Sequence, residues 1–299
     1  MRGFKKDSQI TEIIIDEERV LVSDNPERIA ENFNEYFNQV PVKLVEKLRE
    51  NAEDIDDQDG SRQNIRENHD EETGRRLSGF TLIESDVEQA INQLNNKKST
   101  GLDNVTSSLL KKNAKFFAKI LTPLFNLSLK FGHVPDQLKE TIIVPVYKQG
   151  EKNLVENYRP IALLNIFSKV SERSVKNKLM NYLEHINYFS PNQYGFLRNK
   201  STDTALFNHI QDITASIEKN KATLEIYLDL AFDTISHVKM IDTLRNIGME
   251  RSLLGWFKSY LEKRMYRVKI NEVYSEGKIY EGGGCPRAVS WALSCLTSI

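Results

Sequence analysis

The sequence predicts an α+β fold in which helices and short strands do not alternate regularly. Several segments have apolar residues at every third or fourth position, which is typical of helices that bury one face. Other, shorter segments are rich in β-branched and aromatic residues, as strands are. Irregular order argues against a doubly wound α/β sheet. With 299 residues, 39% of them hydrophobic, the chain can form one large or two small domains.

The predicted helices begin at recognisable capping residues. Asn25 followed by Pro26 is an N-cap followed by proline at the first helical position. Ser85 and Glu88 have the spacing of a capping box and predict the start of a second helix. Further helices are predicted over residues 113–131, 167–187, 202–219, 237–247 and 250–263.

Four short strands are predicted between these helices. The clearest signal is the alternation of Leu224, Ile226 and Leu228 with more polar residues, which is typical of a half-buried strand. The four predicted strands cover residues 141–146, 223–229, 266–271 and 278–281.

Composition excludes some classes of protein. The sequence has no run of about 18 apolar residues that could span a bilayer, and no apolar signal block follows Met1. We therefore expect an intracellular protein, cytoplasmic or nuclear, without a membrane partner. Its two cysteines, Cys285 and Cys295, do not have the spacing of a common zinc motif, so neither a zinc site nor a disulfide is expected.

The net charge of −1 conceals an uneven distribution of charge along the chain. Residues 97–200 contain 17 lysines and arginines against 7 acidic residues, a balance that suits a phosphate backbone as partner. Residues 50–59 are acidic and poor in apolar residues, which is typical of a flexible linker. Some cations of the basic region have a simpler interpretation as the solvated face of a helix: Lys111, Lys112, Lys115 and Lys119.

Asp229 ends the predicted strand 223–229, and Phe232 and Asp233 follow it. A carboxylate at a strand end is held rigidly while its oxygens remain accessible. Mg²⁺ prefers hard oxygen ligands of this kind. The alternative is an acidic residue that is merely solvated at the surface. The motifs elsewhere in the chain favour the metal site.

Five short motifs follow one another along the chain, beginning with Asn-Tyr-Arg-Pro-Ile-Ala-Leu-Leu at residues 157–164. The others lie at residues 167–170, 193–196, 256–261 and 267–271. In this order they resemble the reverse transcriptase domain of a non-LTR retrotransposon of the LINE type, similar to the jockey group. The resemblance strengthens from Phe80 and continues to Pro286.

The resemblance implies a right-hand polymerase with fingers, an incomplete palm and no thumb. It assigns residues 80–220 to the fingers and residues 221–286 to a partial palm, followed by a tail (287–299). Capping residues and composition predict a helical N-terminal extension (1–49) and an acidic flexible linker (50–79) before them. The resemblance also implies the reaction of an RNA-directed DNA polymerase, which adds deoxynucleotides to a DNA primer on an RNA template with Mg²⁺. No other small-molecule cofactor is expected.

The same resemblance assigns roles to particular residues. Asp229 corresponds to the first catalytic carboxylate and metal ligand, and Phe232 to the aromatic residue that screens the sugar 2′ position. Lys148 and Arg159 correspond to a cationic pair that binds the incoming triphosphate. Arginine offers forked donors to phosphate and lysine a mobile point charge. The plainer alternatives are a lysine exposed in a turn and an arginine in a structural ion pair.

Gln193, Gly195 and Arg198 are the candidates for contact with the nucleic acid. They lie in and just after the Gln-Tyr-Gly-Phe motif at residues 193–196. The resemblance implies that Arg198 touches template or primer, and that Gln193 and Gly195 shape the same surface.

Two departures from the family pattern predict that this copy is inactive. Two-metal transfer needs carboxylates that hold two cations about 3.5–4 Å apart, and the 299 residues contain no Tyr-x-Asp-Asp motif to complete the set. Phe232 also lies three positions after Asp229 and not five, so two residues are missing after Leu230. We also expect residues 221–299 to pack poorly, because the palm sheet lacks its central hairpin.

Residues 287–299 do not continue the family pattern. If one base is restored inside codon 287, the genetic code permits the expected Gln-Gly-Ser-Val-Leu-Gly-Pro-Leu-Leu across this stretch, so an out-of-frame tail is expected. Two alternatives to a truncated, decayed reverse transcriptase remain open. One is a nucleic-acid-binding module built on the basic fingers without catalysis. The other is an untranslated pseudogene or gene-model artefact.

Overall fold

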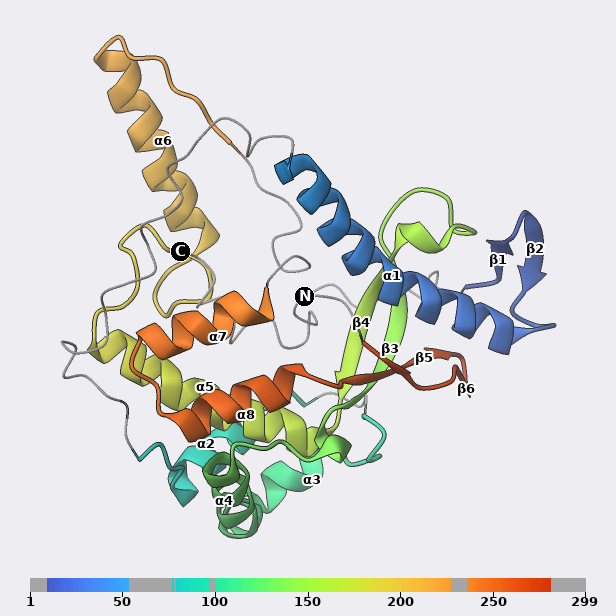
Figure 1. The fold of residues 1–299 in the computed structure, drawn as a ribbon, viewed down its shortest axis with the longest axis horizontal. Coiled ribbons are helices and arrows are strands. Elements are labelled where there is room, and N and C mark those ends of the chain that lie inside the picture. The colour runs from blue at the N-terminus through green and yellow to red at the C-terminus, as the bar shows by residue number, and fades with distance from the viewer. Residues whose placement is uncertain (1–9, 54–76, 78, 97–99, 227–235, 281–299) are drawn as a thin grey trace.

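The fold of the protein is known from a computed structural model, which describes residues 10–53, 77, 79–96, 100–226 and 236–280 (Figure 1). The helices are α1 (Pro26–Glu53), α2 (Glu84–Asn92), α3 (Ser107–Lys112), α4 (Ala114–Phe131), α5 (Ile166–His185), α6 (Thr202–Glu218), α7 (His237–Asn246) and α8 (Arg251–Leu261). The strands are β1 (Glu12–Ile15), β2 (Glu18–Leu21), β3 (Glu140–Tyr147), β4 (Tyr158–Leu164), β5 (Met265–Ile270), β6 (Val273–Tyr274) and β7 (Lys278–Ile279). The predicted mixture of helices and strands is confirmed.

The main sheet joins segments that are distant in sequence. Its strand order is β4-β3-β5-β6, and β7 also pairs with β5. Strands β3 and β4 form an antiparallel hairpin, while β3 and β5 run parallel, with Ile142 beside Arg267. A separate antiparallel hairpin is formed by β1 and β2.

Two prolines face each other in the β3–β4 ladder, Pro145 and Pro160. The Lys148 N–H donates to the Asn157 carbonyl at 2.8 Å, so Lys148 and Asn157 form a hydrogen-bonded pair. Hydrogen-bonded and non-hydrogen-bonded pairs alternate along an antiparallel ladder, and this alternation makes the two prolines a non-hydrogen-bonded pair. Neither proline therefore has to donate within this ladder. On its other side, β3 pairs with β5 only as far as Ile143, before the chain reaches Pro145. The ladder thus loses no hydrogen bond to either ring.

Strands β6 and β7 are one returning strand interrupted by a bulge. The Ser275 N–H donates to the Val268 carbonyl at 2.9 Å, and Lys278 pairs with Tyr266. Between these two links the returning strand has two residues where β5 has one, which is the pattern of a β-bulge.

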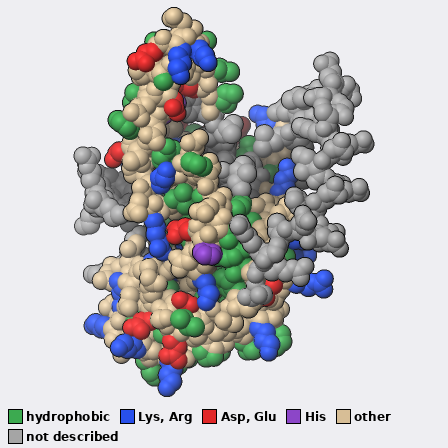
Figure 2. All heavy atoms as spheres, turned by 90° about the vertical axis from the view of Figure 1, so that its left-hand side faces the viewer, with side chains coloured by type: hydrophobic (Ala, Val, Ile, Leu, Met, Phe, Trp, Pro, Cys, Tyr) green, Lys and Arg blue, Asp and Glu red, His purple; other side chains and the backbone are tan. Residues whose placement is uncertain are grey.

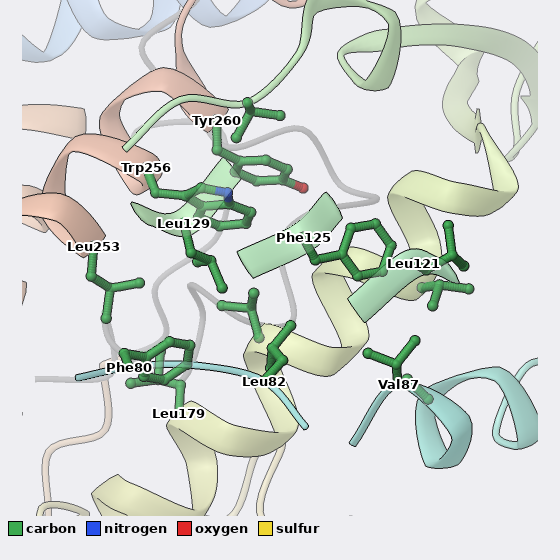
Figure 3. Packing of buried hydrophobic residues seen from close by; sticks show 14 of the residues in the cluster. Phe80, Leu82, Val87, Leu121, Phe125, Leu129, Leu179, Leu253, Trp256 and Tyr260 are labelled. Atoms are coloured by element: carbon green, nitrogen blue, oxygen red, sulfur yellow. The ribbon is translucent and has the colours of Figure 1, made fainter. Parts of the chain in front are cut away.

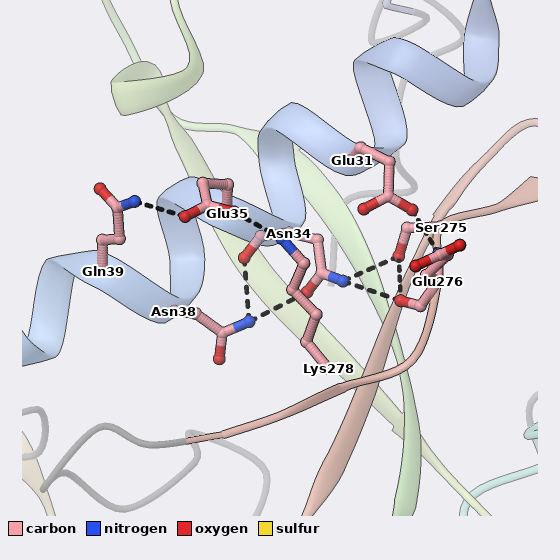
Figure 4. Close-up of polar contacts among 8 residues, drawn as sticks. All are labelled: Glu31, Asn34, Glu35, Asn38, Gln39, Ser275, Glu276 and Lys278. Atoms are coloured by element: carbon pink, nitrogen blue, oxygen red, sulfur yellow. Dashed lines mark hydrogen bonds and ion pairs between the residues drawn. The ribbon is translucent and has the colours of Figure 1, made fainter.

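Helix α1 lies across one face of the sheet and is fixed to the bulge by polar contacts (Figure 4). Asn34 donates to the Ser275 hydroxyl at 3.0 Å and to the Glu276 carbonyl at 2.9 Å. The Glu276 N–H donates to the Glu31 carboxylate, and Lys278 forms an ion pair with Glu35.

The buried apolar residues form two cores. The first lies between α2, α4, α5, α7 and α8, and includes Phe80, Phe125, Leu179 and Trp256 (Figure 3). The second is formed by α1, the β1–β2 hairpin and one face of the main sheet. Burial of these apolar surfaces is the main favourable contribution to folding.

Gly132 ends α4 in the left-handed conformation, with φ of 62°. A Cβ atom there would lie 2.8 Å from the carbonyl oxygen of Ser252 and 3.4 Å from the Cα atom of Gly255. The glycine therefore serves both the helix C-terminus and the close approach of α4 to α8.

Most of the predicted helices are confirmed. The ranges 113–131, 167–187, 202–219, 237–247 and 250–263 correspond to α4, α5, α6, α7 and α8 within one or two residues at each end. The capping box of Ser85 and Glu88 is wrong. Helix α2 begins at Glu84, and the Asp86 carboxylate accepts the Ile83 N–H at 3.0 Å.

The strand predictions were less complete. Strands β3, β5 and β7 confirm three of the four predicted strands, but β1, β2, β4 and β6 were not predicted. Residues 223–226 are not in a strand, and residues 227–229 lie outside the described residues. The N-terminal extension is not purely helical, because β1 and β2 precede α1.

The expectation of poor packing after residue 220 is wrong for residues 237–270. Helices α7 and α8 contribute to the same core as α2, α4 and α5. Trp256 is 3% exposed, and its indole N–H donates to the Ser128 hydroxyl at 3.0 Å. The boundary between fingers and palm at residues 220 and 221 stays a prediction.

Helix α6 projects from the rest of the molecule (Figures 1 and 2). None of its residues is buried. Its exposed apolar side chains include Leu206, Phe207, Ile210 and Ile217.

None of the helices in the described ranges combines the length and the apolar composition that a membrane-spanning helix needs.

Candidate nucleotide and nucleic-acid site

Lys148 and Arg159 lie on one face of the β3–β4 hairpin. Successive side chains of a strand point to opposite faces. Tyr158 is buried against Phe33 of α1, with the ring centroids 5.1 Å apart, so the neighbouring Arg159 points away from α1. Val146 pairs with Arg159, and Lys148 follows Val146 by two positions. Lys148 and Arg159 are therefore diagonal neighbours on the face opposite α1, and both are exposed.

The connection between the two strands is held by its own side chains. The Tyr147 hydroxyl donates to the Gly150 carbonyl, and the Tyr158 hydroxyl to the Lys152 carbonyl, each at 2.6 Å. Gly150 has φ of 89°, and a Cβ atom there would lie 2.7 Å from the amide of Asn157. These contacts fix the end of the hairpin, and with it the backbone that carries Lys148 and Arg159.

Neither cation is neutralised by a recorded partner. Among the described residues, no ion pair or side-chain hydrogen bond is recorded for Lys148 or Arg159. The structural ion pair proposed as the plainer role of Arg159 is thus not seen in the described part of the chain. The exposure of Lys148 just after β3 agrees with a phosphate ligand and also with a simple turn lysine.

Gln193, Gly195 and Arg198 lie in the loop between α5 and α6. Gln193 is buried, with 8% of its surface exposed, and its side-chain nitrogen has no hydrogen-bond partner among the described residues. Gly195 and Arg198 are exposed. Lys200 lies over the ring of Tyr194, 4.6 Å from its centroid, which fixes part of the loop.

The structure therefore places the described candidate residues in two locations. Lys148 and Arg159 belong to the hairpin, while the α5–α6 loop lies at the opposite side of the molecule in Figure 1. The roles of the loop residues stay predictions.

Asp229 and Phe232 lie outside the described residues. Within the described ranges, no group of three or more His, Cys, Asp or Glu side chains is placed to hold a metal ion. Just before the gap, the carboxylate of Glu225 lies 3.2 Å from the Nε2 atom of His209 on α6, so Glu225 reaches that helix.

Two further cations share the face of Lys148 and Arg159 and were not predicted as site residues. Ile142 pairs with Arg267 in the parallel β3–β5 ladder, so Arg267 and Lys269 point to the same side as Lys148. The alternation of buried Tyr266, Val268 and Ile270 with Arg267 and Lys269 was visible in the sequence. What the sequence could not show was that β5 lies beside β3.

Comparison with known proteins shows which proteins the chain resembles. Residues 146–287 match the family model "Reverse transcriptase (RNA-dependent DNA polymerase)". The chain is a relative of the reverse transcriptases of non-LTR retrotransposons. The resemblance seen in the motifs is confirmed. All the described candidate residues, from Lys148 to Arg198, lie within residues 146–287, which the reverse transcriptase model matches.

The similar proteins include three RNA-directed DNA polymerases from Drosophila melanogaster. The probable RNA-directed DNA polymerase from transposon BS is 28% identical over 66% of this chain and 22% of its own length. The RNA-directed DNA polymerase from mobile element jockey is 29% identical over 69% of this chain and 23% of its own length. The probable RNA-directed DNA polymerase from transposon X-element is 26% identical over 64% of this chain and 21% of its own length. The chain thus spans about a fifth of the length of these curated relatives.

Proposed function

We propose that this chain is a segment of a non-LTR retrotransposon reverse transcriptase that binds nucleic acid and nucleotide phosphates but does not itself extend a primer. Its relatives are RNA-directed DNA polymerases, so the partners would be an RNA template, a DNA primer and deoxynucleoside triphosphates. The observation that carries the binding half of this proposal is the exposed pair of Lys148 and Arg159 on one face of the β3–β4 hairpin.

The hairpin suits phosphate because its two cations are held at defined positions. Arg159 can offer two parallel N–H donors to a phosphate, and Lys148 adds a point charge from the neighbouring strand. Since both side chains are exposed and have no recorded acidic partner among the described residues, binding a phosphate breaks no ion pair there.

The absence of polymerisation rests on the sequence. Asp229 is the one match to the catalytic carboxylates, and the 299 residues contain no Tyr-x-Asp-Asp motif. Two bound metal ions would activate the primer 3′ oxygen and stabilise the triphosphate, and they need a set of carboxylates as a shared cage. The spacing of Asp229 and Phe232 also lacks two residues, so we place neither in a working arrangement.

The division of the chain forms part of the same proposal. We assign residues 80–220 to the fingers, 221–286 to a partial palm and 287–299 to an out-of-frame tail. The end of the family match at residue 287 supports the assignment of the tail.

A binding titration tests the proposal. The probe is a fluorescent oligo(rA)·oligo(dT) primer–template, titrated at several salt concentrations from about 50 to 200 mM. The double variant Lys148→Gln, Arg159→Gln should bind more weakly, with a slope of log affinity against log salt that is smaller by about 2. The matched control, Lys115→Gln with Lys119→Gln, removes the same charge from the exposed side of α4. No binding by the unmodified protein at low salt contradicts the proposal.

A further inference from the structure

Helix α6 carries an apolar stripe that faces solvent. Residues three, four or seven positions apart lie on one side of a helix, and the members of this stripe have that spacing. They are Leu206, Phe207, Ile210 and Ile217, each more than half exposed. Figure 2 shows such apolar side chains along the projecting helix. A continuous apolar surface of this kind on a soluble protein marks a contact with another protein surface.

Helix α4 carries a second apolar stripe on its outer side. Its inner side contributes Leu121, Phe125 and Leu129 to the first core. The outer side also has apolar residues at three- and four-residue spacing, and all of them are exposed. They are Phe116, Ile120, Leu124, Leu127 and Phe131. Helix α4 is therefore apolar on both sides, although only its inner side packs against other helices of the described chain.

The two helices carry opposite charges. Within Thr202–Glu218, the acidic residues of α6 are Asp203, Asp212 and Glu218, and lysines occur only beyond the ends of the helix. Helix α4 contains lysines and no acidic residue, and the sequence has no aspartate or glutamate between residues 104 and 135. An acidic apolar helix and a basic apolar helix are complementary surfaces.

The charges lie beside the apolar stripes. Asp203 precedes Leu206 by three positions, and Lys130 follows Leu127 by three, so each charge projects from the same side of its helix as the stripe. When the two stripes pack together, these charges come to lie at the rim of the contact. Charged residues at the rim of an apolar centre are the usual arrangement of a protein–protein interface.

The two helices of one chain do not meet. Helix α6 projects at the upper left of Figure 1, while α4 lies at the lower edge of the molecule. The complementary partner of each stripe is therefore available only on another copy of the chain. Side chains of neighbouring helices interdigitate at an axial separation of about 8–10 Å, which the projecting α6 can reach on a second molecule.

We propose that the chain self-associates head to tail, with α6 of one copy packed along α4 of the next. The apolar stripes form the centre of the contact, and the acidic residues of α6 face the lysines of α4. Because the two surfaces differ, each copy can bind two neighbours, and assembly continues beyond a dimer unless a ring closes. This contact goes beyond the proposed function, because it needs neither nucleic acid nor nucleotide.

Sedimentation velocity of the full chain tests the proposal. From about 1 to 200 μM, the weight-average mass should rise with concentration, since a single pair of helices is a small, reversible interface. Raising the salt concentration from about 0.05 to 0.5 M should lower that mass, because exposed ion pairs are screened. A mass that stays at the value of one chain throughout overturns the proposal.

Two variants test which helices meet. Leu124→Glu with Leu127→Glu places acidic residues on α4, where they repel the acidic α6. Leu206→Lys with Ile210→Lys places basic residues on α6, where they repel the basic α4. Each variant alone should remain monomeric. In an equimolar mixture the first variant supplies an unchanged α6 and the second an unchanged α4, so a heavier species should reappear.

The mixture separates this contact from its alternatives. A misfolded variant could not restore association, so recovery in the mixture excludes misfolding as the cause. Val238→Lys on α7 changes another exposed apolar residue and should leave self-association within twofold of the unmodified chain. Loss of association in only one of the two double variants would indicate a contact of one helix with its own copy, and overturns the proposal. A mixture that stays monomeric also overturns it.

Discussion

The side chain of Asn34 on α1 donates a 3.0 Å hydrogen bond to the hydroxyl of Ser275, which lies at the bulge between β6 and β7. Asn34 is 1% exposed and Ser275 is 3% exposed. The Ser275 hydroxyl also accepts the Val268 N–H at 2.9 Å, so one buried oxygen joins α1, the bulge and β5. The N-terminal helix is thereby tied to the strand that carries Arg267.

Replacing Asn34 by alanine should destabilise the protein by about 1–3 kcal/mol. The change removes the two hydrogen bonds that Asn34 donates to the Ser275 hydroxyl and the Glu276 carbonyl, and each such bond contributes about 0.5–1.5 kcal/mol. Urea unfolding measures the difference. Gln39→Ala on the exposed side of α1 is the control and should change the free energy of unfolding by less than about 0.5 kcal/mol. Equal effects of the two changes would contradict the proposed link.

A buried carboxyl group should make stability depend on pH. Burial raises the pKa of Glu172 from 4.5 to about 7, although Arg264, the Tyr260 hydroxyl, Lys169 and Arg173 act in the opposite direction. The folded state therefore holds the Glu172 proton up to about pH 7, while the unfolded chain releases it near pH 4.5. This contribution is complete below about pH 4.5 and is lost as the pH rises through about 7.

Glu172→Gln should flatten that part of the stability profile. The glutamine is neutral at every pH, so the decline between about pH 4.5 and 7, at most about 1.4 kcal/mol per pH unit, should disappear. Chemical unfolding of both proteins across this range gives the two slopes. Parallel curves would show that Glu172 does not titrate as its burial requires.

Trp256 should stabilise the regions on both sides of residue 220. Its ring stacks on Tyr260 with centroids 5.3 Å apart (Figure 3). Its N–H donates to the Ser128 hydroxyl of α4. Trp256→Ala removes a large buried side chain and should cost about 3–5 kcal/mol. Hydrogen exchange should show that amides of both α4 and α8 lose protection together. Loss confined to α8 would mean that the two regions unfold separately.

The sequence predicted the helices well because their apolar periodicity is strong and their backbone hydrogen bonds join residues close in sequence. It did not predict β4, because Pro160 interrupts the strand signal. That proline is tolerable because it lies in a non-hydrogen-bonded pair of an edge strand, which the local sequence does not show. The strand expected at residues 223–229 had the clearest alternation of all, yet residues 223–226 are not paired in the described structure. Alternation predicts a strand only where a neighbouring strand is present to pair with it.

The candidate site could be predicted only in part, for a related reason. Lys148 and Arg159 lie near each other because a single hairpin joins them, and the motif carried that information. Arg267 and Lys269 join them through a parallel pairing between segments far apart in sequence. No local pattern encodes such a pairing, so it required the structure.

Primer extension under saturating binding tests the central claim most directly. The protein is mixed with oligo(rA)·oligo(dT) at a concentration where anisotropy shows the primer–template to be bound, and dTTP is added with Mg²⁺ or Mn²⁺. We predict a bound primer of unchanged length, because Asp229 alone cannot hold the two metal ions. Extension that disappears in Asp229→Ala would contradict the account, since it would show a working carboxylate set in a chain that we propose only binds.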